Sequence, residues 1–354
     1  MCYPAVVAVA ALLELRRGRL VESRHLGALA VADAGGRLVA SVGDPDLLVF
    51  PRSTLKPLQA LPLVESGALD APALDAGDLA IACASHGGAP EQTARVSHLL
   101  TAAKAGPEAL ECGPHAPYDP DAARALVRFG ASPSALHHTC SGKHAGFLLL
   151  ARRLGAPLEG YVDPDHAVQR AVRAAVATTA GVAPAALHPT VDFCHAPSWA
   201  LPLCALAVAY ARLFDPPDLP PARAAALRRV AHAMTGHPAL VGGPEGRLDT
   251  ALMQAVPGLV AKSGAEGVIA LAVAGPGGRA LGLALKVADG DGARRARGPV
   301  VVEALRQLGI PPAEPGGPLD HLHAGRFGAR AEAEAAGIYV GEVATVFTLA
   351  RAPS

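Results

Sequence analysis

The chain has 354 residues and a formal net charge of zero, with 31 basic and 31 acidic side chains. These charges are mixed along the chain, so the sequence gives no sign of a surface that binds nucleic acid. Apolar residues make up 51% of the chain, but no stretch reaches the roughly 18 uncharged apolar residues of a membrane-spanning helix. We therefore expect a protein with neither nucleic acid nor a membrane as a partner.

The first residues and the cysteines indicate the compartment. Met1-Cys2-Tyr3-Pro4 has no basic side chain, and the apolar run behind it soon meets Glu14, which fits a strand better than a signal peptide. We expect a soluble cytoplasmic protein. The cysteines lack the dense spacing of a secreted disulfide scaffold, so most of them should be buried thiols. They are Cys2, Cys83, Cys112, Cys140, Cys194 and Cys204.

Lysine is rare in this chain. Five of the 31 basic residues are lysines, and the other 26 are arginines. A guanidinium is effectively never deprotonated, whereas a desolvated lysine can lose its proton and act as a base. A lysine in an arginine-rich chain is therefore a candidate for chemistry. The five are Lys56, Lys104, Lys143, Lys262 and Lys286.

The N-terminal part of the chain predicts strands followed by a helix. Strand patterns cover 5–15, 26–33 and 37–42, and the last two are joined by a Gly-containing hairpin turn at 34–36. From Ser53 onward, apolar residues recur at helical spacing up to about position 67, which predicts a helix. The following segment is rich in alanine and is expected to be mainly helical to about position 255.

The C-terminal part predicts a return to strands. A Gly-Pro-Gly-Gly turn at 275–278 separates two strand-like runs, and a helix and further strands follow. The expected elements are strands over 267–274 and 280–287, a helix over 297–308, and strands over 338–340 and 343–349.

Strands at both ends and helices between them predict an α+β fold. The simplest architecture is one antiparallel sheet formed by the two termini, with a helical region packed beside it. We expect one domain over 1–354, in which 1–69 and 256–354 form the sheet part and 70–255 the mainly helical part.

Ser53-Thr54-Leu55-Lys56 is an S-x-x-K motif at the predicted start of a helix. A spacing of three residues puts both side chains on one helix face, where the lysine can take the proton of the serine. Free N–H groups at the helix start would favour a developing oxyanion. The motif alone is common, and its structural alternative is Ser53 as a helix cap with Lys56 in solvent.

Lys262-Ser263-Gly264 matches the K-[ST]-G signature of penicillin-recognising enzymes. In that fold the signature lies on a strand that borders the site and faces the S-x-x-K helix. The two motifs therefore support one another by their order and separation, and a serine–lysine hydrolase becomes the favoured interpretation.

Cys83-Ala84-Ser85-His86-Gly87-Gly88 places a hydroxyl and an imidazole ahead of a glycine pair. Ser85 could pair with Lys262 as a second serine–lysine couple. The alternative is ordinary turn chemistry, in which serine caps and glycine supplies a positive φ.

A dense group of nucleophile and ligand types occurs in His137-His138-Thr139-Cys140-Ser141-Gly142-Lys143-His144. Cys140 could be a thiolate ligand, with a histidine or the distant Cys194 completing a soft metal site. Spacing alone leaves the alternative open that both cysteines are buried thiols and that the histidines only satisfy hydrogen bonds.

Taken together, these segments resemble the bacterial L-asparaginases of the serine–lysine type, called the asparaginase II or class 3 family. The string around Lys143 is the most specific. The resemblance extends over Leu20-Val21-Glu22-Ser23-Arg24-His25, Pro51-Arg52-Ser53-Thr54-Leu55-Lys56-Pro57-Leu58-Gln59, Ala84-Ser85-His86-Gly87-Gly88, Cys140-Ser141-Gly142-Lys143-His144-Ala145-Gly146 and Lys262-Ser263-Gly264.

The resemblance implies a fold shared with serine β-lactamases, penicillin-binding proteins and serine-dependent glutaminases, a homodimer, and hydrolysis of L-asparagine to L-aspartate and ammonia. It implies Ser53 as the nucleophile with Lys56 as its base, and Ser85 with Lys262 as the second couple. The substrate-binding residues that it implies are Arg52, His86, Gly142 and Asp192. It further implies a Zn²⁺ site formed by Cys140, Lys143 and Cys194.

Two places depart from the family pattern. One is the His137-His138 pair, where a second histidine would supply an additional ligand or alter the substrate contacts. The other is Phe193, at a position where a smaller residue is expected, which bears on pocket size. A glutaminase or a β-lactamase-like acyl hydrolase on the same fold is therefore the first alternative. The second is an inactive amino-acid-binding protein, although retained lysines in an arginine-rich chain favour catalysis.

Overall fold

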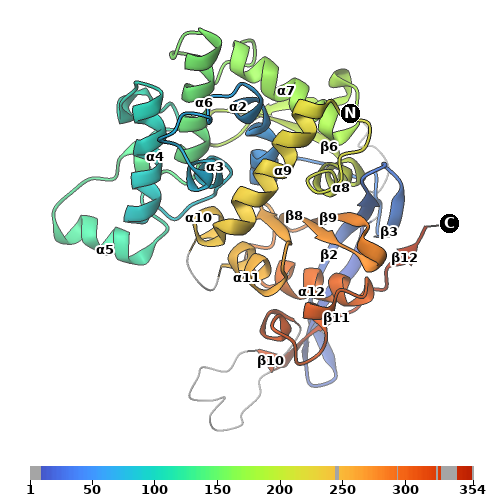
Figure 1. Ribbon diagram of the computed structural model, residues 1–354. Coiled ribbons are helices and arrows are strands. Elements are labelled where there is room, and N and C mark those ends of the chain that lie inside the picture. The colour runs from blue at the N-terminus through green and yellow to red at the C-terminus, as the bar shows by residue number, and fades with distance from the viewer. Residues whose placement is uncertain (1–8, 244–246, 293, 324–325, 328–340, 353–354) are drawn as a thin grey trace, which may run out of the picture.

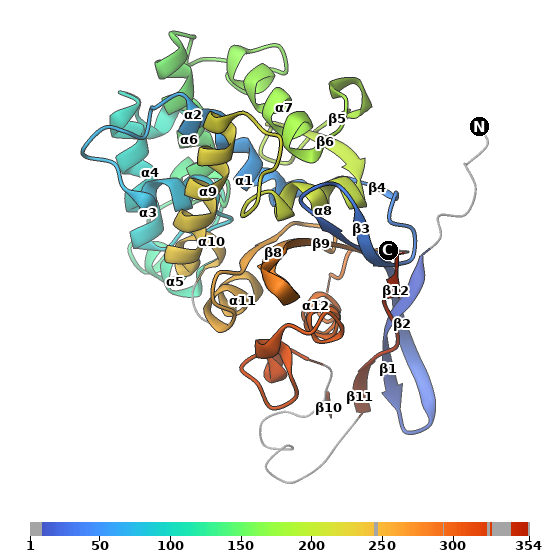
Figure 2. The same ribbon diagram turned by 45° about the vertical axis from the view of Figure 1, so that its right-hand side comes forward.

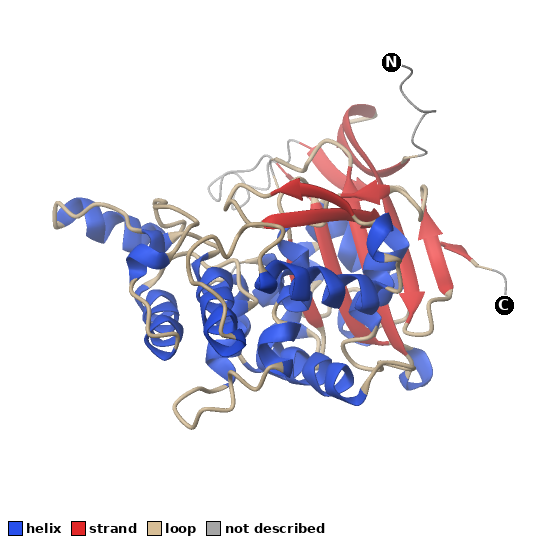
Figure 3. Cartoon of the chain, turned by 90° about the horizontal axis from the view of Figure 1, so that it is seen from above, coloured by secondary structure: helices blue, strands red, loops and turns tan. Residues whose placement is uncertain are grey.

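The computed structural model describes residues 9–243, 247–292, 294–323, 326–327 and 341–352. Strands gather on one side of the molecule and helices on the other, as Figure 3 shows from above. None of the helices in the described ranges is long and apolar enough to cross a membrane. The arrangement confirms the expected mixture of helices with an antiparallel sheet, while the closer likeness to β-lactamases stays a prediction.

The main sheet has nine strands, and both ends of the chain contribute to it. Its order is β10-β11-β1-β2-β9-β8-β7, with β3 beside β2 and β12 beside β3. Figure 1 shows the blue N-terminal strands next to the red strand β11. The strands are β1 (Ala10–Arg17), β2 (Leu20–Asp33), β3 (Leu38–Val42), β7 (Val260–Ser263), β8 (Val268–Ala274), β9 (Ala280–Val287), β10 (Arg326–Phe327), β11 (Gly341–Thr345) and β12 (Ala350–Arg351).

The centre of the sheet is covered on both sides. Strands β2 and β9 pair antiparallel, and β8 extends the ladder. Helix α8 (Leu203–Ala211) packs on β2, β8 and β9, whereas α12 (Arg297–Gln307) packs on β1, β9 and β11. Figure 2 shows α8 and α12 on opposite sides of β8 and β9. Burial on both sides explains why the central strands read as continuous apolar runs rather than as alternating patterns.

The mainly helical part also carries a small sheet of order β4-β6-β5, which the sequence did not predict. These strands are β4 (Leu48–Val49), β5 (His188–Val191) and β6 (Pro197–Pro202). Besides α8, the α-helices of this part are α3 (Ala76–Ala82), α4 (Pro90–Ala102), α5 (Pro120–Arg128), α6 (Ser141–Leu154), α7 (Ala167–Ala180), α9 (Pro221–Gly236), α10 (Pro238–Gly242) and α11 (Leu248–Ala255).

The single helix expected from Ser53 onward is divided into three short pieces. They are η1 (Arg52–Leu55), α1 (Lys56–Gln59) and α2 (Leu61–Glu65). Pro57 and Pro62 lack a backbone N–H, and each lies at the first positions of a new piece, where that donor is not needed.

The other expected elements differ mainly in their ends. The second strand begins earlier than predicted, at Leu20, and the last predicted strand is replaced by the short strands β11 and β12. The strand expected over 338–340 and the first residues of that expected over 5–15 lie outside the described residues.

Packing of α8 on the sheet depends on Gly282 in β9. A Cβ atom at this position would lie 1.8 Å from the carbonyl oxygen of Ala207 in α8. We predict that Gly282→Ala lowers the free energy of unfolding by roughly 1–3 kcal/mol, because the helix must move off the strand. Urea denaturation measures this change. Gly292→Ala is the control, since no atom lies within 4 Å of its added Cβ, and equal effects of both substitutions would contradict the packing argument.

Candidate active site

The S-x-x-K segment lies against the end of strand β7. Gly264, which follows β7, is so close to η1 that a Cβ there would lie 2.7 Å from the carbonyl oxygen of Pro51. Arg52, directly before Ser53, has a φ of 56°. A non-glycine residue in this region costs on the order of 1–3 kcal/mol, and such strain clusters at functional sites. The tertiary structure therefore brings the S-x-x-K and K-S-G motifs together, as expected.

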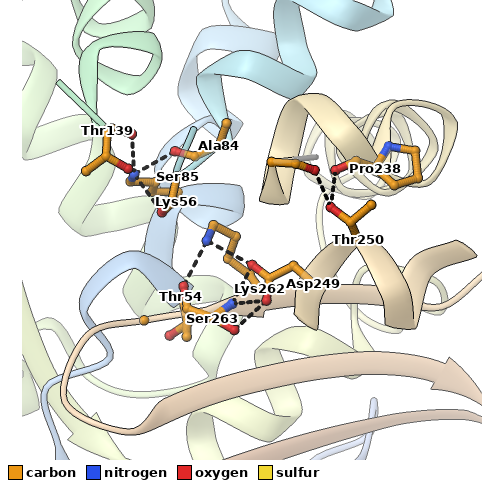
Figure 4. A network of polar contacts seen from close by, with 12 residues as sticks. Thr54, Lys56, Ala84, Ser85, Thr139, Pro238, Asp249, Thr250, Lys262 and Ser263 are labelled. Atoms are coloured by element: carbon orange, nitrogen blue, oxygen red, sulfur yellow. Dashed lines mark hydrogen bonds and ion pairs between the residues drawn. The ribbon is translucent and has the colours of Figure 1, made fainter. Parts of the chain in front are cut away.

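The Lys56 side chain is buried, and its amine contacts two other segments of the chain. Its Nζ donates to the carbonyl oxygen of Ala84 at 2.6 Å, to Ser85 Oγ at 3.0 Å and to the carbonyl oxygen of Thr139 at 3.3 Å. Figure 4 shows this group of contacts. Three acceptors match the three N–H donors of an ammonium group.

The hydrogen bonds of Lys56 add a contact that the sequence did not predict, while the role of Lys56 as the base for Ser53 stays a prediction. No hydrogen bond joins Lys56 to Ser53 within the described ranges, and the serine that Lys56 contacts is Ser85. The reason is that a buried amine must satisfy its donors, and the acceptors converge from segments far away in the sequence. Helical spacing alone could not show them.

Lys262 is fully buried on β7 and does not form the expected pair with Ser85. Its Nζ lies 3.2 Å from Asp249 Oδ2 and 2.8 Å from the carbonyl oxygen of Ser263. Burial lowers the pKa of the Lys262 amine to about 8, although the Asp249 carboxylate favours the charged form. An amine with a pKa near neutral is suited to proton transfer.

Asp249 is the site residue that sequence reasoning missed. It begins helix α11, and its carboxylate accepts hydrogen bonds from the backbone N–H and the hydroxyl of Ser263 as well as from Lys262. Although burial opposes its charge, Lys262 and Ser263 lower the pKa of this carboxyl. No motif surrounds Asp249 in the sequence, so its proximity to Lys262 is decided by the packing of α11 on β7.

The turn after α3 holds Ser85 in place. The backbone N–H of Ser85 donates to the carbonyl oxygen of Val241 at 3.0 Å. His86 is fully buried, with Nδ1 accepting from the Gly88 N–H and Nε2 lying 2.9 Å from Ser141 Oγ. Burial lowers the pKa of His86 to about 3, so the ring is neutral at pH 7. Both ring nitrogens are engaged inside the protein, and substrate binding by His86 stays a prediction.

Gly142 has a packing role that the sequence did not predict. It lies in helix α6, buried against α3, and a Cβ there would lie 2.1 Å from the carbonyl oxygen of Ile81. Close packing of the two helices accounts for glycine at this position, and a substrate contact is not needed to explain it.

Arg52 and Asp192 form an ion pair next to Ser53. Arg52 Nε donates to Asp192 Oδ1 at 2.9 Å, and the terminal nitrogen NH2 lies 2.8 Å from the same oxygen. The carboxylate is buried, whereas the guanidinium keeps 24% of its surface exposed. An exposed guanidinium beside a carboxylate offers complementary partners for the α-carboxylate and α-ammonium of an amino acid.

The two sequence departures lie together at this edge of the site. His138 stacks on Phe193 with ring centroids 5.0 Å apart, and His115 meets the edge of His138 at 5.5 Å. His138 Nδ1 accepts from the Cys140 N–H, and burial lowers the pKa of this ring to about 3. His137 instead accepts from Ser134. The stacked rings of His138 and Phe193 thus lie beside Asp192 and Cys194.

The residues of the expected metal site converge in the interior. Lys143 Nζ lies 3.1 Å from Cys194 Sγ, and Cys140 donates a hydrogen bond to the same sulfur. The hydrogen bond from Cys140 and the charge of Lys143 hold the pKa of Cys194 well below its usual range, against the effect of burial. Although burial disfavours its charge, the sulfurs of Cys194 and Cys140 raise the pKa of Lys143.

This donor set fits a soft metal ion, because two sulfurs and an amine face one another away from water. No group of three or more His, Cys, Asp or Glu side chains suited to a metal occurs among the described residues. The third donor is therefore the Lys143 amine, which would have to lose its proton to act as a ligand.

A family model described as L-asparaginase II matches residues 13–343. The chain belongs to the L-asparaginase II family. This membership confirms the resemblance seen in the sequence motifs and supports an amidohydrolase activity.

The other comparisons find distant or no similarity. The search of curated proteins finds no match. A crystal structure of Mglu in its native form in 4.3 M NaCl is 18% identical with a TM-score of 0.39, over 76% of this chain and 58% of that one. A second Mglu structure is 19% identical with a TM-score of 0.34, over 79% and 67% of the two chains. The chain thus spans less than two thirds of the first of these structures.

The Lys262–Asp249 pair predicts the pH dependence of any reaction in which the Lys262 amine accepts a proton. If neutral Lys262 is required, kcat/KM should fall about tenfold per pH unit below its pKa, which is about 8. Asp249→Asn removes a charge that raises this pKa, so the midpoint should move to lower pH by roughly one to three units. The profile of the exposed Asp70→Asn variant should match wild type. An unshifted midpoint in active Asp249→Asn would show that Lys262 is not the titrating group.

Proposed function

We propose that this protein hydrolyses L-asparagine to L-aspartate and ammonia through a serine–lysine mechanism. The observation that carries the proposal is that two buried lysine amines come from the S-x-x-K and K-S-G motifs. Lys56 Nζ donates to Ser85 Oγ at 3.0 Å, and burial lowers the pKa of Lys262, which pairs with Asp249, to about 8. Membership in the L-asparaginase II family supports the same reaction class.

In the proposed reaction Ser53 Oγ forms a bond to the carbonyl carbon of the side-chain amide. The serine proton passes to a neutral lysine amine, which then delivers it to the amide nitrogen as the C–N bond breaks and ammonia leaves. Water next attacks the acyl carbon and gives one proton to the lysine amine, which delivers it to Ser53 Oγ as the bond between the acyl carbon and this oxygen breaks and aspartate leaves.

We assign the base role to Lys56, with Lys262 as the second amine that tunes the site. Lys56 donates to Ser85, so a proton leaving Ser53 can be shared among Lys56 and the Ser85 hydroxyl. Burial and the nearby Lys56 lower the pKa of Lys262, which favours a neutral Lys262 amine in the site. Free N–H groups at the start of η1 are available for the oxyanion.

Arg52 and Asp192 are proposed to bind the α-carboxylate and the α-ammonium of the substrate. Both groups are shared by asparagine and glutamine, which differ by one methylene. Apolar contacts discriminate such a difference by only about 10 to 200-fold. A glutaminase therefore remains the second candidate, and a panel of asparagine, glutamine and a chromogenic β-lactam decides among the substrate classes.

We predict that Ser53→Ala lowers ammonia release from asparagine by at least roughly 10³-fold, since the nucleophile acts as a unit with its base. An acyl-enzyme trapped by acid quench should appear in the intact mass of wild type and be absent from Ser53→Ala. An adduct that persists in Ser53→Ala but disappears in Ser85→Ala would reverse the roles of the serines. Wild-type protein that binds asparagine without releasing ammonia would favour the amino-acid-binding alternative.

We further propose one Zn²⁺ held by Cys140, Lys143 and Cys194. When bound, the ion would act as a Lewis acid that orients substrate, since the serines and lysines already supply the nucleophile and bases. A homodimer is part of the same proposal, and light scattering of purified protein tests it.

Removing one sulfur should remove the metal. We predict that Cys140→Ser loses zinc and remains folded, while the control Cys204→Ser, whose thiol lies elsewhere and is partly exposed, keeps it. Zinc occupancy should fall as pH drops, because thiolate and amine ligands must be deprotonated. Elemental analysis after mild dialysis measures both effects. Equal zinc retention in the two variants would show that Cys140 is a buried thiol and not a zinc ligand.

A further inference from the structure

A buried imidazole that the proposed reaction does not use lies next to the sulfur cluster. His144 follows Lys143 in helix α6 and is fully buried. Its Nε2 makes no well-aligned hydrogen bond to any described residue, although the sulfur of Cys194 lies beside it. A buried polar nitrogen without an oxygen or nitrogen partner is rare and needs an explanation.

The contacts of the other ring nitrogen, Nδ1, identify which nitrogen of His144 carries the hydrogen. His144 Nδ1 lies 2.7 Å from the hydroxyl of Tyr161, and the same hydroxyl oxygen accepts from the backbone N–H of Glu111 at 2.8 Å. Tyr161 is fully buried, so its own hydrogen also needs an acceptor. Within the described ranges the acceptor it faces is His144 Nδ1. A neutral imidazole that accepts at Nδ1 carries its hydrogen on Nε2.

We infer that Tyr161 and His144 are positioning residues that hold the Cys194 sulfur by a directed N–H donor. The chain of donors runs from the Glu111 N–H to the Tyr161 oxygen, from the Tyr161 O–H to His144 Nδ1, and from His144 Nε2–H to Cys194 Sγ. Each N–H or O–H group in this series donates one hydrogen bond, and each acceptor atom in it receives one.

Glu111 also restrains the residue on the other side of this sulfur. The carbonyl oxygen of Glu111 lies 2.8 Å from His195 Nδ1, and His195 has a φ of 69°. A strained backbone persists where the surroundings determine it. Glu111 is therefore connected to Cys194 in two ways. Its backbone N–H is connected through Tyr161 and His144, and its carbonyl oxygen through His195, the residue after Cys194.

This inference makes His144 a partner of a metal ligand and not a ligand itself, because its Nε2 carries a hydrogen. Such outer partners orient the ligand, and their loss typically costs about 10 to 100-fold in metal affinity. The expected effect on zinc rests on the zinc site proposed above, whereas the hydrogen position does not.

The first measurement is the tautomer of His144 in metal-free wild-type protein, read from two-bond ¹⁵N–¹H correlations of the imidazole rings. Assignment comes from the spectrum of His144→Gln. We expect the Nε2–H form. An Nδ1–H form would overturn the inference, whether or not the protein binds zinc.

The second measurement is zinc affinity, determined by competition with a chelator at one pH. Tyr161→Phe removes one hydroxyl and should weaken zinc about 10 to 100-fold. Tyr210→Phe is the matched control, because this buried hydroxyl donates to the carbonyl oxygen of Thr54, away from the sulfurs. Cobalt-substituted Tyr161→Phe should also show an altered sulfur-to-cobalt absorption band. Affinities within twofold of each other in the two variants would overturn the inference.

If the protein binds no zinc, the zinc proposal is contradicted, but the inference about Tyr161 and His144 is not. In that case the alkylation rate of Cys194, followed by peptide mass analysis, takes the place of affinity. Tyr161→Phe should change this rate at least threefold relative to Tyr210→Phe, and equal rates would overturn the inference.

Discussion

Burial of lysine amines is the constraint on which the site depends. Lys56 and Lys262 are almost completely excluded from water, and an isolated ammonium in such a place would be strongly disfavoured. The protein meets this constraint in two ways. Lys56 is surrounded by oxygen acceptors, whereas Lys262 has one carboxylate, Asp249, and a carbonyl. At Lys262 burial lowers the pKa of the amine, although the Asp249 carboxylate favours its charged form.

Lys143 shows what a different partner does to the same side chain at similar burial. Its amine faces Cys194, whose pKa is held below its usual range by the Cys140 hydrogen bond and the Lys143 charge, and the sulfurs of Cys194 and Cys140 raise the pKa of Lys143. Lys262 has a carboxylate neighbour, Asp249, which favours its charge, but burial and the nearby Lys56 lower its pKa. Burial disfavours charge on both lysines, so the local balance of charges decides the sign of each shift. The same fold therefore contains one buried lysine whose pKa is raised, Lys143, and another whose pKa is lowered, Lys262.

The architecture places these lysines on rigid elements. Lys262 lies on a strand in the main sheet, and Lys56 lies at the start of α1, directly after η1. Gly264 lets the end of β7 approach Pro51, and Gly142 lets α6 approach α3. The two glycines set the distances between the segments that carry the reactive groups. Small residues at these crossings therefore have a functional consequence without touching a substrate.

The sequence by itself determined the order of elements, the antiparallel sheet built from both ends of the chain, and the family. It also identified the two lysine motifs and the sulfur-containing cluster, because these signals depend on residue types at short spacing. Tertiary structure alone decided that Lys56 contacts Ser85, that Lys262 pairs with Asp249, and that His86 and Gly142 serve packing and internal hydrogen bonds. These contacts join residues far apart in the chain, and hydrophobic periodicity carries no information about which distant polar groups meet once the helices pack on the sheet.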